Sequence, residues 1–227
     1  MVSAAVNAQV SVGISSGLGH YQLKEVRSLQ QLVTTSLPVP AKITADFPDY
    51  WFYEGHIKLQ SNKLIGGLHV NFGSTGGRIS YADYSGSYTG DQLLRYYSVL
   101  GSVGYRYALS AKRLIVTGSL HAGALMGKME LADQLIIGDL VYNESDTYVH
   151  TNAVVEPHIE LGKEWKRVEL FFNAGYQLTF KAGKAKLKSD KDQSLINTEG
   201  DPLQVRFDGY RIAFGIRYRL SSTPLKQ

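Results

Sequence analysis

The stretch that decides the fold lies near the C-terminus, where residues 210–220 read YRIAFGIRYRL. Its side chains alternate strictly between two kinds. The aromatic and aliphatic ones are Tyr210, Ile212, Phe214, Ile216, Tyr218 and Leu220. The intervening positions carry only small or basic residues, from Arg211 to Arg219. Because successive side chains of a β-strand point to opposite faces, this pattern predicts a strand with one apolar face.

Period-two alternation recurs along most of the chain, in seven further stretches. They span residues 9–19, 50–60, 64–73, 93–109, 114–126, 154–162 and 168–180. Helical spacing of apolar residues occurs in one place, residues 22–36, which end before Pro38 and Pro40. We therefore expect eight strands and a single helix.

The predicted connections alternate in length. Short turns are expected at 61–63, 110–112 and 163–167, and long polar loops at 20–46, 82–92, 132–147 and 183–203. All short turns, and both chain ends, then lie at one end of the strands. Up-and-down antiparallel topology follows.

The composition excludes several classes of protein. The 227 residues are 44% hydrophobic and 19% charged, which is typical of a folded chain rather than a disordered one. A net charge of +4 with scattered basic residues argues against a nucleic-acid partner. The absence of cysteine excludes disulfides and thiolate sites. No run approaches the ~18–20 apolar residues of a membrane-spanning helix.

The face opposite the aromatic one mixes glycine with charged residues of both signs, which is unusual for a surface in contact with water. A closed eight-stranded barrel fits this pattern if the apolar face points outward to lipid and the small and charged face fills a narrow lumen. Tyrosine, with 15 residues against 8 of phenylalanine, suits the two membrane interfaces. A soluble lipocalin-like barrel with its apolar residues inward is the alternative.

On these strands, on the alternation of turns and loops, and on residues 210–220, the chain resembles the small outer-membrane barrels of the OmpA and OmpX type and the PorT-like outer-membrane proteins. The resemblance covers residues about 9–220 and implies a multi-pass barrel in a Gram-negative outer membrane. The turns would face the periplasm, and the last strand would be read by the barrel-assembly machinery. Residues 1–8, which end in Val6-x-Ala8, are expected to be a signal-peptide remnant or N-terminal tail, and residues 221–227 a C-terminal tail.

Polar residues predicted to face the lumen form the main candidate site. They are Glu54, His56, Lys58, His69, Asn71, Arg106, His121, Glu156, His158, Glu160, Glu169, Arg211, Arg217 and Arg219. In so narrow a space these charges must pair, which favours a static salt-bridged plug over a gated ion path. Glu156-x-His158-x-Glu160 resembles a metal trio, but ligands spaced along one straight strand converge poorly, so we expect neither metal nor cofactor.

Two surface features suggest partners. Lys184, Lys186 and Lys188 are predicted at headgroup height, where they would contact the phosphates of lipopolysaccharide or form a solvated loop. The helix at 22–36 and the apolar residues of 135–141 lie in the predicted loops 20–46 and 132–147. They would either cap the barrel mouth together or bind a protein partner.

These observations favour a structural or interaction component of the outer membrane. A small channel is the first alternative, and a lipid A-modifying enzyme is the second. The best grouping for an enzyme is His150 with Ser145 and Asp146, and His20 is expected at a similar height. Such a site is recognised by geometry rather than by sequence proximity, so we predict no enzymatic activity.

Overall fold

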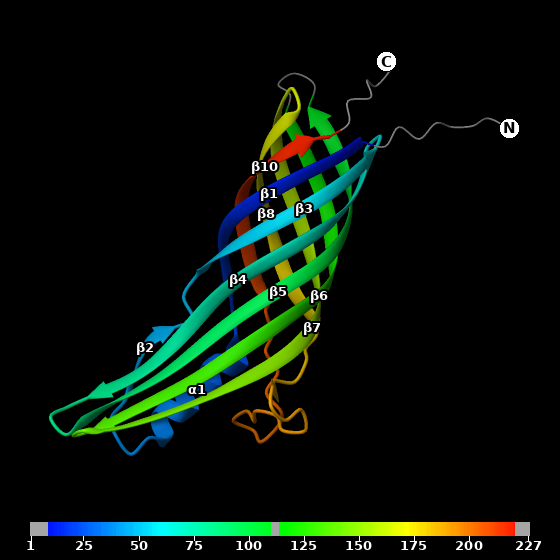
Figure 1. The fold of residues 1–227 in the computed structure, drawn as a ribbon. Helices are drawn as coiled ribbons and strands as arrows, with labels where there is room; N and C mark the ends of the chain where they lie inside the picture. Colours follow the sequence, from blue (N-terminus) through cyan, green and yellow to red (C-terminus); the bar gives the residue numbers. More distant parts are fainter. Residues whose placement is uncertain (1–8, 110–113, 221–227) are drawn as a thin grey trace.

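The computed structural model describes residues 9–109 and 114–220, most of which form antiparallel strands (Figure 1). Eight strands form a closed ring in the order β1-β3-β4-β5-β6-β7-β8-β10, and β10 pairs back with β1. Their bounds are β1 Gln9–Tyr21, β3 Tyr50–Ser61, β4 Leu64–Ala82, β5 Gly86–Leu109, β6 Leu114–Ile137, β7 Leu140–Trp165, β8 Val168–Lys181 and β10 Gly209–Arg219. The predicted eight-stranded up-and-down barrel is confirmed.

The ring closes over a long register. β1 pairs with β10 from Ser11 opposite Arg219 to Tyr21 opposite Gly209, and with β3 along its other edge. Closure gives every strand of the ring two hydrogen-bonded neighbours, so the ring has no free edge. Within the described residues, no helix has the length and apolar character that crossing a membrane would need.

The predicted alternation of faces is also confirmed. On β10, Ile212, Phe214 and Ile216 are 39%, 60% and 44% exposed on the outside of the barrel, whereas Arg211 and Arg217 are each 2% exposed inside it. The other strands follow the same rule. The barrel therefore has an apolar exterior and carries its buried charges inside, the reverse of a soluble barrel.

Two predicted loops are wrong. Residues 82–92 and 132–147 are mostly strand, because β4–β5 and β6–β7 continue as paired hairpins whose connections span only 83–85 and 138–139. Gly138 adopts a φ of +57°, a conformation that suits a tight hairpin turn. Of the predicted short turns, two are confirmed at 62–63 and 166–167, and the third lies outside the described residues.

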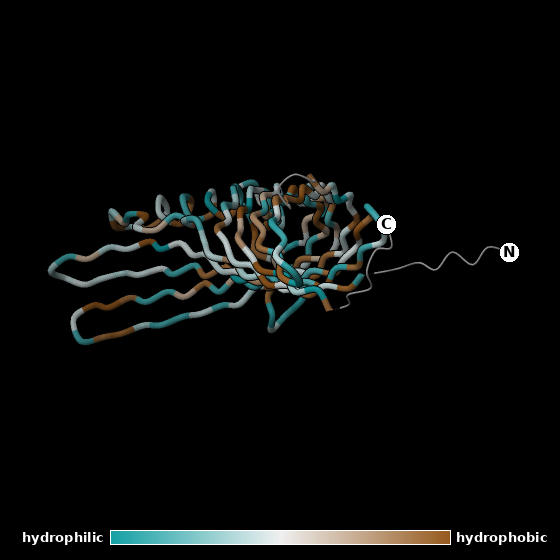
Figure 2. The backbone as a smooth tube through the Cα atoms, turned by 90° about the horizontal axis from the view of Figure 1, so that it is seen from above, coloured by the Kyte–Doolittle hydropathy of each residue, from teal (hydrophilic) through white to brown (hydrophobic). Residues whose placement is uncertain are grey.

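The two hairpins give the molecule its lopsided shape. They extend beyond the ring on one side, and β2 (Lys42–Asp46) and helix α1 (Lys24–Ser36) lie with them (Figure 1). Viewed from above, both hairpins reach sideways past the ring, and one is hydrophobic near its end (Figure 2). We call this side of the barrel the hairpin end and the opposite side, with the short turns, the turn end.

The helix begins two residues later than predicted, after Leu23 in a left-handed conformation (φ 44°), and ends before Pro38. Between β8 and β10, residues 182–208 form an irregular segment that we call the strap. The strap includes the two-residue strand β9 (Lys186–Leu187), which pairs with β7.

The apolar exterior can be tested by placing a charge on it. Phe172 is 47% exposed at the middle of β8, and arginine at a lipid-facing midplane position costs about 2–4 kcal/mol. We expect Phe172→Arg to lower the folded fraction in lipid vesicles. Tyr84→Arg, at a fully exposed residue of the β4–β5 connection, is the matched control and should fold normally. Equal folding of both variants would contradict an exterior that faces lipid.

Candidate functional site

The lumen holds the charged residues that the sequence predicted there. All ten that define the predicted network are buried: Glu54, His56, Lys58, Arg106, His121, Glu156, His158, Glu160, Arg211 and Arg217. Strand alternation places them, because they occupy the inward positions of β3, β5, β6, β7 and β10. His69, Asn71 and Glu169, which were also predicted to face the lumen, are buried there as well.

Glu160 is the centre of the network. Its Oε2 accepts hydrogen bonds from Lys58 Nζ at 2.9 Å and from Arg217 Nη2 at 2.6 Å. The Arg217 guanidinium also pairs with Glu169 at 3.3 Å and lies over the Phe171 ring. Two cations thus share one fully buried carboxylate, in an arrangement that stabilises the folded state only while every member is present.

A second ion pair lies nearer the hairpin end. Arg211 donates from Nη1 to Glu156 at 2.9 Å and from Nη2 to the Asn71 side chain at 2.8 Å, and its guanidinium stacks on Phe52 at 3.9 Å. Glycine makes room for these groups: a Cβ atom at Gly175 would collide with the Glu156 carboxylate. The excess of glycine in the sequence therefore reflects, in part, the width of the lumen.

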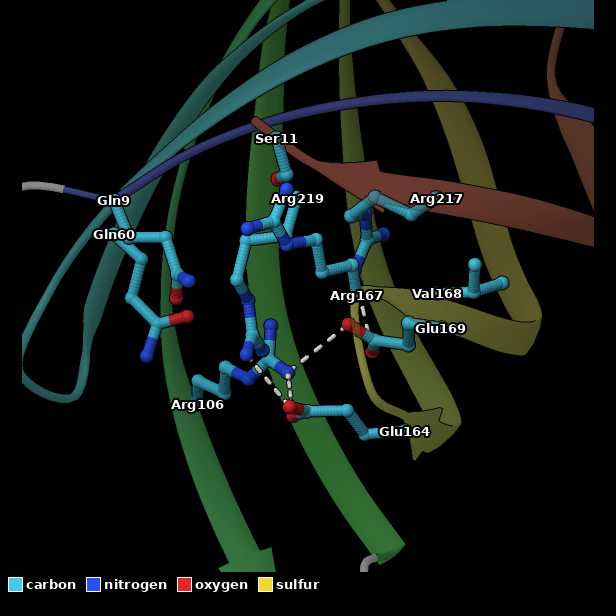
Figure 3. Close-up of a pocket in the computed structure, with 10 residues that line it drawn as sticks. All are labelled: Gln9, Ser11, Gln60, Arg106, Glu164, Arg167, Val168, Glu169, Arg217 and Arg219. Atoms are coloured by element: carbon cyan, nitrogen blue, oxygen red, sulfur yellow. Dashed lines mark hydrogen bonds and ion pairs between the residues drawn. The ribbon is translucent and has the colours of Figure 1, made fainter. Parts of the chain in front are cut away.

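Arginines and glutamates close the lumen at the turn end (Figure 3). Arg106 donates to Glu169 at 3.0 Å and lies 3.6 Å from Glu164, which also accepts from Arg219 at 2.6 Å. The cavity between them measures about 10 Å³, room for about one water molecule. Glu164 was predicted to lie in a turn, and its position opposite Arg219 depends on the register of β7, which the sequence alone does not reveal.

Four histidines cross the lumen in a row. The ring of His69 lies 5.3 Å from that of His56 and 4.2 Å from that of His121, and His121 is 4.5 Å from His158. Glu54 faces two of these rings with one carboxylate oxygen. Its Oε1 bonds His69 Nδ1 at 2.9 Å and lies 3.2 Å from His56 Nδ1.

Glu54, His56 and His69 are close enough to hold a metal ion, with ligand atoms all within 4.8 Å of one another. The neighbouring contacts oppose this use. Arg217 Nε donates to His56 Nε2 at 3.2 Å, so Nε2 accepts, and the proton of a neutral ring lies on Nδ1, facing Glu54. A metal would need that nitrogen deprotonated. The geometry fits a hydrogen-bonded carboxylate better.

The two carboxylates of Glu156-x-His158-x-Glu160 are directed to different partners. Glu156 is directed to Arg211, while Glu160 is directed to Lys58 and Arg217. Each carboxylate therefore balances a cation of the lumen.

An apolar cap closes the hairpin end of the lumen. Helix α1 contributes Val26 and Leu29, and the strap contributes Ala185, Leu203, Val205 and Phe207, each of these last four fully buried. They pack against aromatic residues of the barrel wall, among which Tyr50 and Tyr96 meet edge to face. The Glu25 carboxylate, which accepts from Gln204 N–H, joins helix to strap. The predicted role of the helix in a cap is thus confirmed.

The other half of the predicted cap is wrong. The apolar residues of 135–141 lie at the tip of the β6–β7 hairpin, where Ile137 and Leu140 are 51% and 59% exposed. They pair with each other across the turn and do not contribute to the core cluster of the cap. The cause is the hairpin itself, which carries them away from the barrel mouth.

The histidines considered for catalysis lack a nucleophile. The buried His150 ring stacks on Phe207, and its Nδ1 lies 3.4 Å from the side chain of Asn152. The partners of His150 are therefore Phe207 and Asn152, and not the predicted Ser145 and Asp146. His20 bonds Asp49 at 2.7 Å and stacks on Tyr210. Among the described residues, neither ring has a serine or threonine hydroxyl as a hydrogen-bond partner, which nucleophilic catalysis by a triad would require.

Lys184, Lys186 and Lys188 are all exposed on the strap, beside β7. The buried residues between and around them, such as Ala185, point toward the cap. The predicted alternation of this lysine cluster is therefore present in the structure.

Solved structures similar to this chain include Ail, the attachment invasion locus protein of Yersinia pestis. It is 13% identical, with a TM-score of 0.39 over 94% of this chain and 97% of Ail. Neisserial surface protein A is 10% identical, with a TM-score of 0.42 over 93% of this chain and 97% of that protein. A major outer membrane protein from Thermus thermophilus is 10% identical, with a TM-score of 0.45 over 93% of this chain and 99% of that protein.

No family model and no curated protein matches the sequence.

The lumen network can be tested at Glu160. Removing one partner of a buried ion pair costs about 3–5 kcal/mol, so Glu160→Gln should lower the free energy of unfolding by that order, measured by urea titration in detergent. Glu164→Gln, at a carboxylate that is 29% exposed, should cost well under half as much. Adding Lys58→Met to Glu160→Gln should restore part of the loss. Equal effects of the two glutamine variants would show that Glu160 is not the centre of the network.

Proposed function

We propose that the chain is an integral outer-membrane barrel, closed to solutes, that serves as an interaction component through the sheet it raises beyond the membrane. The observation that carries this role is the exposed sheet edge of β7. The membrane placement is supported by the apolar exterior, and the closed state by the filled lumen.

The exterior matches a lipid environment. Aliphatic residues such as Leu68 and Ile159, each about half exposed, cover the middle of the barrel, and aromatic residues lie toward both ends of it. Tyr105 and Trp165 lie toward the turn end, whereas Tyr97 and Tyr210 lie toward the hairpin end. Aromatic girdles of this kind favour the two interfaces of a bilayer. Short turns would then face the periplasm, and barrel-assembly machinery would insert the chain.

A channel is poorly supported by this lumen. Ion pairs around Glu160 and Arg106 fill its turn half, and the apolar cap fills the other. An ion would have to cross both.

The sheet beyond the barrel is protected on one edge only. β2 pairs with β4 from Lys42 to Asp46 and covers that edge. On the opposite edge, residues 140–146 of β7 pair with β6 alone, and no other described strand lies beside them. All seven of these residues are exposed. An uncovered strand edge is a template for an added strand.

The side chains of this edge indicate its partner. Leu140, Val141 and Tyr142 are each more than half exposed, and Glu144 and Asp146 follow them. An extended polypeptide segment with apolar residues next to basic ones would complement both parts, through backbone hydrogen bonds and side-chain contacts.

The edge can be tested by placing lysines on it, since a charged edge resists strand addition. In membranes of the native host, we expect the wild-type protein to co-purify with a stoichiometric partner. Val141→Lys/Tyr142→Lys should reduce that partner at least about tenfold. Tyr84→Lys, in the other hairpin, should have no effect. A wild-type protein that purifies alone, or a partner retained by the double variant, would refute a role for the edge.

Closure of the lumen has its own test. Because two plugs lie in series, the purified barrel should give no discrete conductance steps in planar bilayers at neutral pH. Regular steps with the wild-type protein would favour the channel.

A further inference from the structure

A group of cations gathers on the outside of the barrel, next to the apolar exterior and at its hairpin end. It consists of Arg95 on β5, Lys128 on β6, and Lys184, Lys186 and Lys188 on the strap. We call these five residues the basic patch.

The register brings residues from three distant parts of the sequence into one row. Arg95 pairs with Lys128, Lys128 pairs with Val149, and Val149 pairs with Lys186. Paired residues share a face of a sheet, so these three cations point the same way, with about 4.8 Å between neighbouring strands. Lys188 lies one step further along, since its N–H bonds Thr147 O at 2.8 Å, and Thr147 pairs with Glu130.

The patch carries an excess of positive charge. Arg95 and Lys128 have exposed fractions of 49% and 39% at their side chains, and the three strap lysines are exposed. Within the described residues, the one acid in an ion pair with the patch is Glu130, which contacts Arg95 at 3.4 Å and also bonds Lys128. The Lys128 ammonium lowers the pKa of Glu130, so this acid is ionised at neutral pH. The five cations and this carboxylate together carry a net charge of +4.

The position of the patch beside the apolar exterior indicates what kind of ligand it binds. Directly next to the Arg95–Lys128 row, Tyr97 pairs with Met126, and these side chains are 59% and 47% exposed on the apolar exterior. A ligand bound by the cations therefore has hydrocarbon-facing side chains immediately beside it. A lipid meets both conditions, with its anionic headgroup on the cations and its acyl chains along Tyr97 and Met126.

We propose that the basic patch binds the phosphate groups of an outer-leaflet lipid, with Arg95 and Lys128 as the pair fixed by strand register and the strap lysines as additional contacts. Guanidinium suits two phosphate oxygens at once, and lysine provides point charges around them. This inference rests on the proposed membrane placement and is independent of the β7 edge.

The experiment measures lipid binding to the purified barrel by native mass spectrometry from detergent. The probes are lipid A with two phosphates, the same lipid without phosphates, and a phosphorylated disaccharide without acyl chains. The wild-type barrel should bind the first at least about tenfold more tightly than either of the others.

Variants locate the site. Two variants remove the cations of the patch: Arg95→Gln/Lys128→Gln and Lys184→Gln/Lys186→Gln/Lys188→Gln. Each should weaken binding of the phosphorylated lipid by about tenfold. One cation near an anionic surface contributes about fivefold in affinity, and less where several cations share a phosphate. Lys24→Gln/Lys42→Gln removes two exposed cations on α1 and β2 and should change nothing. Glu130→Gln removes the opposing charge and should tighten binding.

Several results would overturn the proposal. Equal binding of the dephosphorylated lipid would remove the role of the phosphates, and equal binding of the disaccharide would assign the patch to a soluble anion. Patch variants that bind like the Lys24/Lys42 control would place the lipid elsewhere. Residues 140–146 are intact in every variant, so a negative result for lipid binding does not contradict the proposed role of the β7 edge. A negative result for the β7 edge likewise does not contradict lipid binding.

Discussion

Closure of the ring is the constraint on which the rest of the structure depends. Once β10 pairs with β1, every strand of the ring has two neighbours within the barrel, and its backbone hydrogen bonds there are satisfied without help from solvent. Side chains must then divide between an outside and a narrow inside. The strict alternation of residues 210–220 is the local expression of this division, with Phe214 outside and Arg217 inside.

The narrow lumen explains why charge appears as a network. Lys58, Arg217 and Glu160 could not remain buried singly, and each is paired with another. Glycines such as Gly175 give these side chains their space. If the lumen is closed, as we propose, the surfaces that remain for function are the exterior, the strap and the two hairpins.

Much of the barrel could be predicted from the sequence because lipid and lumen impose opposite demands on alternate residues. The hairpin tips could not. Beyond the membrane neither face of a strand must be apolar, so the alternation fades around residues 86–92 and 138–146 although the strand pairing continues. The sequence of such polar strands therefore resembles that of loops.

The site was predicted unevenly for a similar reason. Inward residues such as Glu156 and Arg211 follow from alternation, but their pairing depends on register between strands 55 residues apart. Lys184, Lys186 and Lys188 are visible as a cluster in the sequence. Arg95 and Lys128 are not, since only the successive pairing of β5, β6, β7 and β9 brings them to the lysines.

The most direct test of the two-faced barrel uses the absence of cysteine from the chain. Single cysteines introduced in turn at residues 210–218 can carry spin labels, and their collision rates with oxygen in lipid and with a water-soluble nickel reagent can be measured in vesicles. We predict period-two alternation, with high oxygen access at 212, 214 and 216 and low access to both reagents at 211, 213 and 217. Uniform access along the strand, or nickel access at 214, would contradict the account.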